Sequence, residues 1–262
     1  MLGKAFRLLL AGFALTAGCA LAQGTFAHIT YGAGWQTTFT FVNLSSTDTA
    51  NLSLFFYNED GTTLAAPVQG GPTGSPYNFS IAPSGATTIV LLGNVSASTS
   101  IVGWASLQSI GGTPVRGQAA FRRHDPKNPP DFEAAVPMTS SGSLDCIVPF
   151  PPSSNPVIML PYDNTTGQYV TAVAFANTTS SALAVQIEFD DQSNHQVATG
   201  TLNLAANNHT SFVSTSSYAA TANTKGVLRI SADPASLSVL GLLVNLSQAP
   251  LYPISTLLPI TQ

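Results

Sequence analysis

The sequence predicts an all-β protein in which two tandem immunoglobulin-like antiparallel β-sandwiches follow a signal peptide. Three observations support this prediction. Apolar residues alternate with polar ones at a period of two, Gly, Pro and Asn turns separate short runs, and one pattern of runs occurs twice. No exported segment has the apolar period of a helix, so strands are expected throughout.

The first 22 residues have the features of a signal peptide. Lys4 and Arg7 supply positive charge, Leu8–Gly18 is an apolar stretch too short to span a bilayer, and Ala20–Ala22 forms an A-x-A cleavage site. An alternative stays open, because Thr16–Cys19 is similar to the lipobox of bacterial lipoproteins and would place a lipid anchor at Cys19. Both interpretations predict export, either secreted or held at the cell surface.

The period-two alternation predicts strands with one apolar face. In the run 52–57 the apolar set is Leu52, Leu54 and Phe56, and in the run 185–189 it is residues 185, 187 and 189. Antiparallel sheets that cover a core with one face and meet water with the other show this pattern. Turn residues separate such runs at Asp60-Gly61, Pro83-Ser84-Gly85, Gly111–Pro114, Asn207-Asn208 and Asp233-Pro234.

Five landmarks occur in the same order in both halves of the chain. The first two landmarks are Phe41-Val42-Asn43, matched by Phe175-Ala176-Asn177, and the two apolar sets above. In the third, Ser80–Pro83 followed by Thr87–Val90 is matched by Asn203–Ala206 followed by Thr210–Val213. In the last two, Gly103–Leu107 is matched by Gly226–Ile230, and Ala135–Met138 by Leu251–Ile254. The repetition predicts two copies of one β-sandwich, at 25–140 and 157–262, each of the size of an immunoglobulin domain. A Pro/Ser-rich linker at 141–156 joins them.

Four stretches resemble a known group of proteins: GAGWQTTFTFVN (32–43), SIVGWASLQS (100–109), FEAAVPM (132–138) and LPYDNTTGQYVTAVAFAN (160–177). They are similar to a group of secreted proteins of soil bacteria, acidobacterial ones especially. The resemblance covers most of the exported chain, and it implies secretion and a repeated β fold. The group has no assigned activity, so the resemblance implies no catalytic or binding residue.

Charge and cysteine content narrow the function classes. Without Lys4 and Arg7 the exported chain keeps 6 of its 8 basic residues against 12 acidic ones, a net charge of −6. With so few basic residues, nucleic acid is not an expected partner, because its affinity depends on Lys and Arg at phosphates. No later apolar run is long enough for a transmembrane helix. Cys146 has no partner in the exported chain, so the cores must hold the fold without disulfides.

Motifs for catalysis, metals and cofactors are missing, so no catalytic residue, metal or cofactor is expected. The pair Asp190-Asp191 could contribute carboxylates but is typical of a hairpin turn. The turn at Asp163–Gly167 offers oxygens to calcium but few carboxylates, and it is typical of an Asx turn.

One segment stands out by its charge. The stretch 122–133 holds six of the twenty formal charges of the chain, among them Arg122, Arg123, Asp125 and Lys127, with His124 between them. A charged, Pro-stiffened loop on a neutral scaffold is a candidate contact site, because loops on rigid frames carry function. The alternative interpretation is a solubilising hairpin with mutual ion pairs.

Two aromatic side chains are the second candidate site. Phe55 and Tyr57 alternate with Leu54 and Phe56, so they are expected on the outer face of their strand, where flat rings could stack on sugars. The alternative is that a loop or the neighbouring domain covers them. The isolated Trp35 and Trp104 are better explained by core packing.

These observations favour an exported, non-catalytic structural or binding protein, similar in kind to adhesion or carbohydrate-binding modules. Its expected partner is a cell-envelope polysaccharide or a surface protein. A secreted hydrolase with an unrecognised site is the alternative, because scattered Ser, His and Asp side chains can converge in space. An outer-membrane β-barrel is a third class, and the duplicated pattern favours sandwiches over it.

Overall fold

The computed structural model describes residues 22–123, 132–139, 157–248 and 252–261. Several predictions concern residues outside these ranges. These residues are 1–21 of the predicted signal peptide with Cys19, the predicted linker 141–156 with Cys146, and His124, Asp125 and Lys127 of the charged loop.

The N-terminal half (residues 22–139) forms two four-stranded antiparallel sheets. One has the order β1-β8-β3-β6 and the other β10-β9-β2-β7, and a small hairpin of β4 and β5 lies beside them. The strands are β1 (Ala22–Tyr31), β2 (Trp35–Asn43), β3 (Ala50–Asn58), β4 (Ala66–Pro67), β5 (Thr73–Gly74), β6 (Tyr77–Ile81), β7 (Ala86–Leu92), β8 (Ile101–Ile110), β9 (Val115–Arg123) and β10 (Phe132–Pro137).

The C-terminal half (residues 157–261) repeats this arrangement, with sheets in the order β14-β13-β16-β11-β19 and β15-β12-β17-β18. Its strands are β11 (Val157–Asp163), β12 (Tyr169–Asn177), β13 (Leu183–Asp191), β14 (Gln196–Leu204), β15 (His209–Val213), β16 (Lys225–Ser231), β17 (Leu237–Asn245), β18 (Ile254–Leu257) and β19 (Ile260–Thr261). A helical turn, α1 (Ser214–Ser217), and the 3₁₀ segment η1 (Ala219–Thr221) follow β15. The predicted all-β class is confirmed.

The strand orders of the two halves correspond strand by strand. Each main strand of the N-terminal half has a counterpart at the same place in the C-terminal half, where β19 is added at an edge. The strands β11 to β18 correspond, in chain order, to β1, β2, β3, β6, β7, β8, β9 and β10. In both halves the second main strand pairs with the fifth and the third with the sixth. The first four sequence landmarks therefore mark equivalent places in two copies of one topology. The fifth alignment is wrong by five residues, because Ala135 lies opposite Ala120 on β9, and the equivalent residue of β18, opposite Leu242 on β17, is Thr256.

Equivalent residues also have the same physical role. Gly103 on β8 and Gly226 on β16 let the neighbouring strand approach closely. A Cβ at Gly103 would lie 2.0 Å from the carbonyl oxygen of Tyr57, and a Cβ at Gly226 would lie 2.0 Å from that of Asp190. Thr37 and Thr171 are fully buried, and each hydroxyl donates to and accepts from the backbone of the preceding strand. Buried polar groups that are paired in this way do not destabilise a core.

Each pair of sheets encloses its own apolar core. In the N-terminal half Phe26 of β1 contacts Phe39 of β2 edge to face, with ring centroids 5.0 Å apart. In the C-terminal half Tyr162 of β11 contacts Phe189 of β13 at 5.2 Å. The residues of the predicted alternation are buried: Leu52, Leu54, Phe56, Val185, Ile187 and Phe189.

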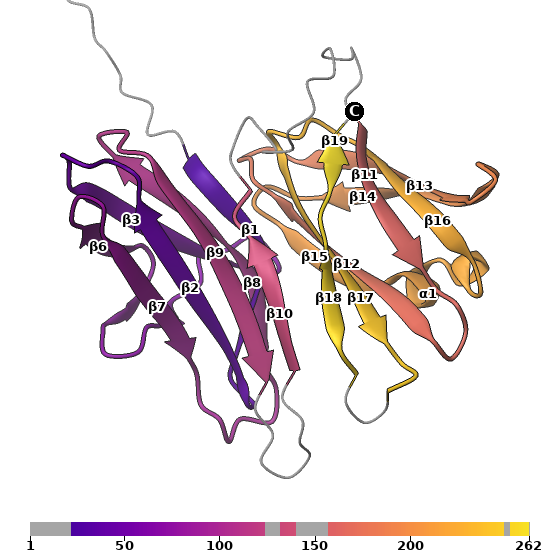
Figure 1. Cartoon of the computed structure of the whole chain (residues 1–262), viewed down its shortest axis with the longest axis horizontal. Helices are drawn as coiled ribbons and strands as arrows, with labels where there is room; N and C mark the ends of the chain where they lie inside the picture. Colours follow the sequence, from indigo (N-terminus) through magenta and orange to yellow (C-terminus); the bar gives the residue numbers. More distant parts are fainter. Residues whose placement is uncertain (1–21, 124–131, 140–156, 249–251, 262) are drawn as a thin grey trace, which may run out of the picture.

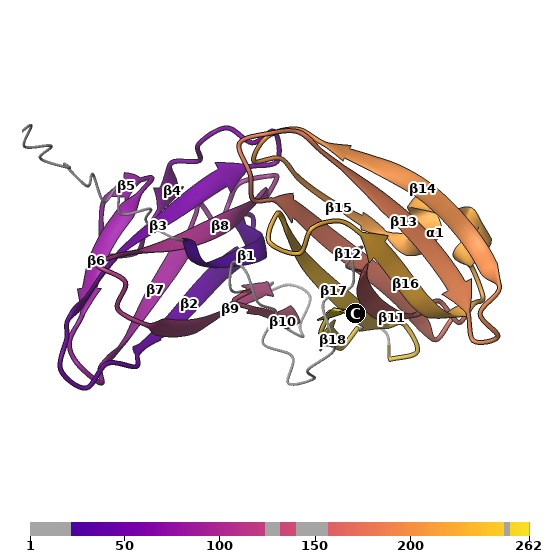
Figure 2. The same cartoon turned by 90° about the horizontal axis from the view of Figure 1, so that it is seen from above.

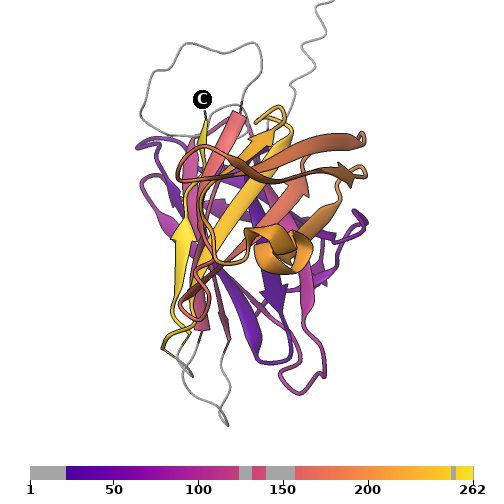
Figure 3. The same cartoon turned by 90° about the vertical axis from the view of Figure 1, so that its right-hand side faces the viewer.

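The two halves lie side by side (Figures 1 and 2). Strand β1 packs against β12 and β17, and β10 lies next to β18. Helix α1 lies on the side of the C-terminal half that faces away from the N-terminal half, and it faces the viewer in Figure 3. Ala174 and Leu240 of the C-terminal half belong to the apolar cluster of the N-terminal half. The junction between the halves is therefore continuous with one of the cores.

Candidate functional site

The junction of the two halves brings together the titratable side chains that carry the candidate site. It is built from β1, from the turn after β3 and from the turn between β14 and β15. These elements are far apart in the sequence, and their side chains meet only because the halves dock.

A bulge in β1 directs His28 toward the C-terminal half. Phe26 pairs with Ala105 and Ile29 with Gly103, so two residues of β1 oppose Trp104 alone. Both Phe26 and Ile29 are fully buried in the core, whereas His28 is half-buried. A bulge is a common device for redirecting one side chain out of a strand.

The turn between β14 and β15 contacts the turn that follows β3. Asn207 has a left-handed backbone with φ of 55°, and its carbonyl oxygen accepts a hydrogen bond of 2.7 Å from Trp104 Nε1. The Glu59 carbonyl oxygen accepts from the backbone N–H of His209 at 2.9 Å and also from Asn208 Nδ2. Gly61 permits this approach, because a Cβ there would lie 2.3 Å from the Ala206 oxygen.

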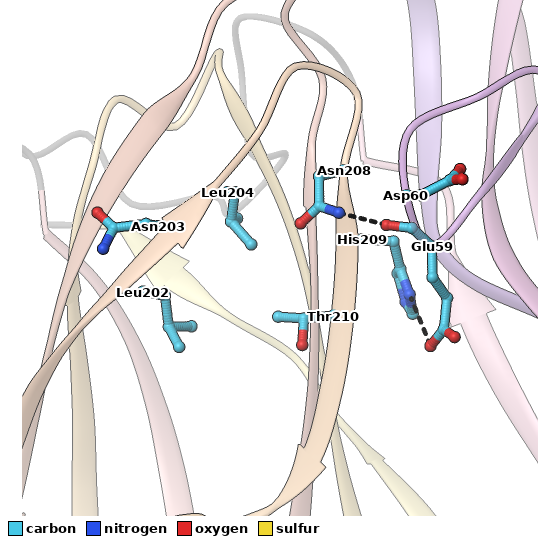
Figure 4. A pocket seen from close by; sticks show the side chains of 8 residues that line it. All are labelled: Glu59, Asp60, Leu202, Asn203, Leu204, Asn208, His209 and Thr210. Atoms are coloured by element: carbon cyan, nitrogen blue, oxygen red, sulfur yellow. Dashed lines mark hydrogen bonds and ion pairs between the residues drawn. The ribbon is translucent and has the colours of Figure 1, made fainter.

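Two imidazoles face each other across the junction. His28 Nδ1 lies 3.4 Å from His209 Nε2, a hydrogen bond whose donor depends on the tautomer. The His209 side chain is fully buried, and its Nδ1 has no hydrogen-bond partner. Glu59 Oε1 lies 3.8 Å from that Nδ1, and Figure 4 shows the ring and the carboxylate pointing toward each other. A carboxylate at this distance favours the tautomer with hydrogen on Nδ1.

Burial keeps both rings neutral near neutral pH. Desolvation lowers the pKa of His28 to about 4. It also lowers the pKa of His209 to about 3, with a further decrease from the neighbouring His28, and a hydrogen bond with the Ala27 backbone opposes these effects in part. Removing a charged ring from water is the dominant cause in each case.

Two grooves flank the imidazole pair. The polar groove, of about 460 Å³, is lined by Glu59, Asp60, Asn203 and Asn208 and reaches His209 (Figure 4). The apolar groove, of about 380 Å³, is lined by His28 from one half and by Ala172, Ala174, Leu240 and Leu242 from the other. Small alanines on β12 leave this space open between larger side chains.

The junction continues along the edge strands β10 and β18. Thr256 Oγ1 donates a hydrogen bond of 2.7 Å to the Ala135 carbonyl oxygen. Phe132 and Tyr252 stack with ring centroids 6.2 Å apart. Hydrogen bonds, stacked rings and apolar packing therefore hold the halves together at several separate points.

Of the two predicted aromatic residues, the structure links Tyr57 to this junction, through its contact with Trp104. Tyr57 and Phe55 are half-buried on the same face of β3. Tyr57 stacks on Trp104 with ring centroids 4.4 Å apart, and burial raises the pKa of its hydroxyl. Trp104 is buried as expected, but it lies on the outer face of β8 under the C-terminal half and not in a sandwich core. Trp35 packs partly buried against the N-terminal core.

Of the charged loop, the described part contains Arg122 and Arg123 at the end of β9 and Glu133 at the start of β10. Arg122 is exposed and lies opposite Glu133 across the hairpin. The structure does not bring these arginines into the imidazole site, which is formed by other residues.

The two acidic turns have structural roles. Asp163 Oδ1 accepts from the backbone N–H of Thr165 at 2.9 Å, as an Asx turn does. Asp191 caps its hairpin in the same way, whereas the buried Asp190 pairs with Arg229 at 2.5 Å. Within the described ranges, no three His, Cys, Asp or Glu side chains gather to hold a metal ion.

Sequence reasoning missed the imidazole pair. His209, the first residue of the strand after Asn207-Asn208, belongs to no recognisable motif, and His28 lies 181 positions away from it in the sequence. The one available signal was a titratable side chain on strands with almost no charge.

The chain matches no protein-family model, no curated protein and no solved structure. Among the described residues, no helix has the length and apolar character needed to cross a membrane.

Proposed function

We propose that the chain is an exported, non-catalytic binding or structural protein made of two tandem immunoglobulin-like sandwiches, of the kind found among secreted proteins of soil bacteria. The signal-like N-terminus supports export. The pairs β2–β7 and β3–β8 correspond to the central strand pairs of an immunoglobulin sandwich. The first and last strands of that sandwich are exchanged between the sheets, since β1 pairs with β8 and β9 pairs with β2.

The observation that carries the binding function is the apolar groove at the junction. Its volume falls in the range of ligand sites, and one imidazole stands among aliphatic walls. Both halves contribute to its lining, so the groove exists only while the halves are docked. An apolar side chain of a surface protein of the cell envelope suits such a groove better than a polysaccharide does, since its lining contains no acidic or amide side chains.

Retention of residues 23–262 on cell envelopes and on insoluble polysaccharides tests this function. Ala172→Leu fills the groove without touching the cores, and Ala184→Leu, on the exposed face of β13, is the matched control. We expect saturable retention on envelopes that Ala172→Leu removes and Ala184→Leu preserves. Equal retention of both variants would place the binding surface elsewhere.

Two further variants address the remaining candidate surfaces. Arg122→Ala with Arg123→Ala tests the charged loop as a contact site, and Phe55→Ser tests the half-buried ring beside Tyr57. Loss of retention in either variant alone would move the proposed contact to that surface.

A secreted hydrolase is the second candidate function, favoured by one observation. Ser211 and His28 line the same apolar groove, as a nucleophile and its base would. Hydrolysis of a chromogenic acetyl ester by the purified protein, lost in Ser211→Ala, would establish it. An equal rate in that variant would exclude Ser211 as the nucleophile.

A further inference from the structure

The imidazole pair lies among strands with very few charges. Four of the strands that pack against β1 contain no Asp, Glu, Lys or Arg: these are β2, β8, β12 and β17. Strand β15, which carries His209, contains none either. The other neighbours, β9 and β10, carry Arg116, Arg122, Arg123 and Glu133. Glu59 faces His209 from the turn after β3, and Asp60 lies beside it in the polar groove.

We propose that the junction is an acid-sensitive contact, in which protonation of His28 and His209 separates the two halves while each half keeps its own fold. Facing nitrogens 3.4 Å apart can share one hydrogen when at least one ring is neutral. When both rings are protonated, both nitrogens carry hydrogen, the hydrogen bond is lost and two positive charges face each other. Glu59, with a side chain 60% exposed, offsets this only in part.

The direction of the pH effect follows from proton linkage. In the docked state the pKa of His28 is about 4 and that of His209 about 3, and exposure on separation returns each toward 6.5. The separated state therefore binds more protons, and acid favours it. Docking is fully stable above pH of about 6.5 and weakens as the pH falls toward 4. For His28 alone the difference corresponds to roughly a 300-fold shift in the equilibrium.

The effect is directed at the junction because both histidines of the described ranges that are shielded from water, the buried His209 and the half-buried His28, lie there. The apolar clusters of the two halves contain no histidine, and His195 has a side chain that is 80% exposed in the hairpin after β13. The ion pair of Asp190 with Arg229 lies within one sheet of the C-terminal half, so that pair does not report on docking.

Spin labels at Thr88→Cys on β7 and Ala184→Cys on β13, with Cys146→Ser, measure the distance between the halves by electron resonance. We expect one narrow distance at pH 7.5 and a broad distribution below about pH 4, while far-UV circular dichroism stays unchanged. His28→Gln with His209→Gln should keep the narrow distance down to pH 3, and His195→Gln should behave as the parent protein.

Three results would overturn the proposal. They are a narrow distance in the parent protein at pH 3, loss of the dichroism signal at the same pH as the distance change, and an unchanged transition in a folded double variant. Should the double variant not fold, NMR titration of the histidine rings of the parent protein decides. Ring shifts of His28 and His209 that move only below pH 5 support the proposal, and a titration of either near 6.5 contradicts it.

Discussion

Asn43 and Asn177 make the same hydrogen bonds at equivalent places in the two halves. Each is almost fully buried at the end of its strand, and its carboxamide nitrogen donates to three backbone carbonyls. These belong to Asp48, Ile81 and Ala82 for Asn43, and to Ser181, Leu204 and Ala205 for Asn177. Each carboxamide oxygen accepts the N–H two residues later, at 3.0 Å. The repeated Phe-x-Asn of the sequence is therefore an architectural device.

Asn43→Ala and Asn177→Ala should each destabilise the protein by about 2–4 kcal/mol, because each removes all the hydrogen bonds of a carboxamide that is almost fully buried. Urea unfolding of the full chain measures the loss. Replacement by Asp, which keeps the acceptor oxygen but removes the donors, should cost a similar amount. A loss below about 0.5 kcal/mol in the Ala variants would show that water replaces the side chain.

Gly103→Ala and Gly226→Ala should each cost about 2–4 kcal/mol, because the new Cβ overlaps a backbone carbonyl of the neighbouring strand. Gly74→Ala is the matched control, since its Cβ would meet nothing within 4 Å. Thermal unfolding of the three variants measures the difference. Equal melting temperatures for Gly103→Ala and Gly74→Ala would contradict the close approach.

Much of the fold could be predicted because it depends on local patterns. The alternation at Leu52, Leu54 and Phe56 identified a buried face without any knowledge of the partner strand. The turns at Pro83-Ser84-Gly85 and Asn207-Asn208 were recognisable from residues that tolerate a left-handed backbone, which Ser84 and Asn207 adopt.

The candidate site depends on docking, which no local pattern encodes. Tyr57 alternates as an outward residue, and its stacking on Trp104 depends on the pairing of β3 with β8. The hydrogen bond of Trp104 to Asn207 depends in turn on the position of the C-terminal half. His28 faces the junction because of a bulge, and a bulge shifts the period that the prediction relies on. The sequence therefore predicts the sheets better than it predicts the contact between them.

Trp104→Phe should weaken the junction more than it weakens either core. The change removes the Nε1 donor to the Asn207 carbonyl and reduces the stack on Tyr57. We expect faster amide exchange at Asn208 and His209 and a loss of about 1–3 kcal/mol. Trp35→Phe is the control, because Trp35 packs on the N-terminal core, and it should leave exchange at those two amides unchanged.

Arg229→Met should destabilise the C-terminal half, because it leaves the buried carboxylate of Asp190 without its partner. The loss should be about 2–3 kcal/mol, allowing for the Arg229 side chain being 32% exposed. The double change Arg229→Met with Asp190→Asn should recover part of it. Urea unfolding followed by far-UV circular dichroism measures both. A double variant less stable than Arg229→Met alone would show that Asp190 has a second role.

The two halves should differ in their independence when they are expressed separately. The apolar cluster of the C-terminal half contains only its own residues, whereas that of the N-terminal half includes Ala174 and Leu240. We therefore expect residues 157–262 to unfold cooperatively alone, and residues 23–140 to be less stable and to gain stability when the other half is added. Urea unfolding of each half and of their mixture measures this. If neither half folds alone, the chain is a single intertwined unit and the tandem arrangement is wrong. If the mixture unfolds as the sum of the two separate halves, the apolar cluster that includes Ala174 and Leu240 does not stabilise the N-terminal half.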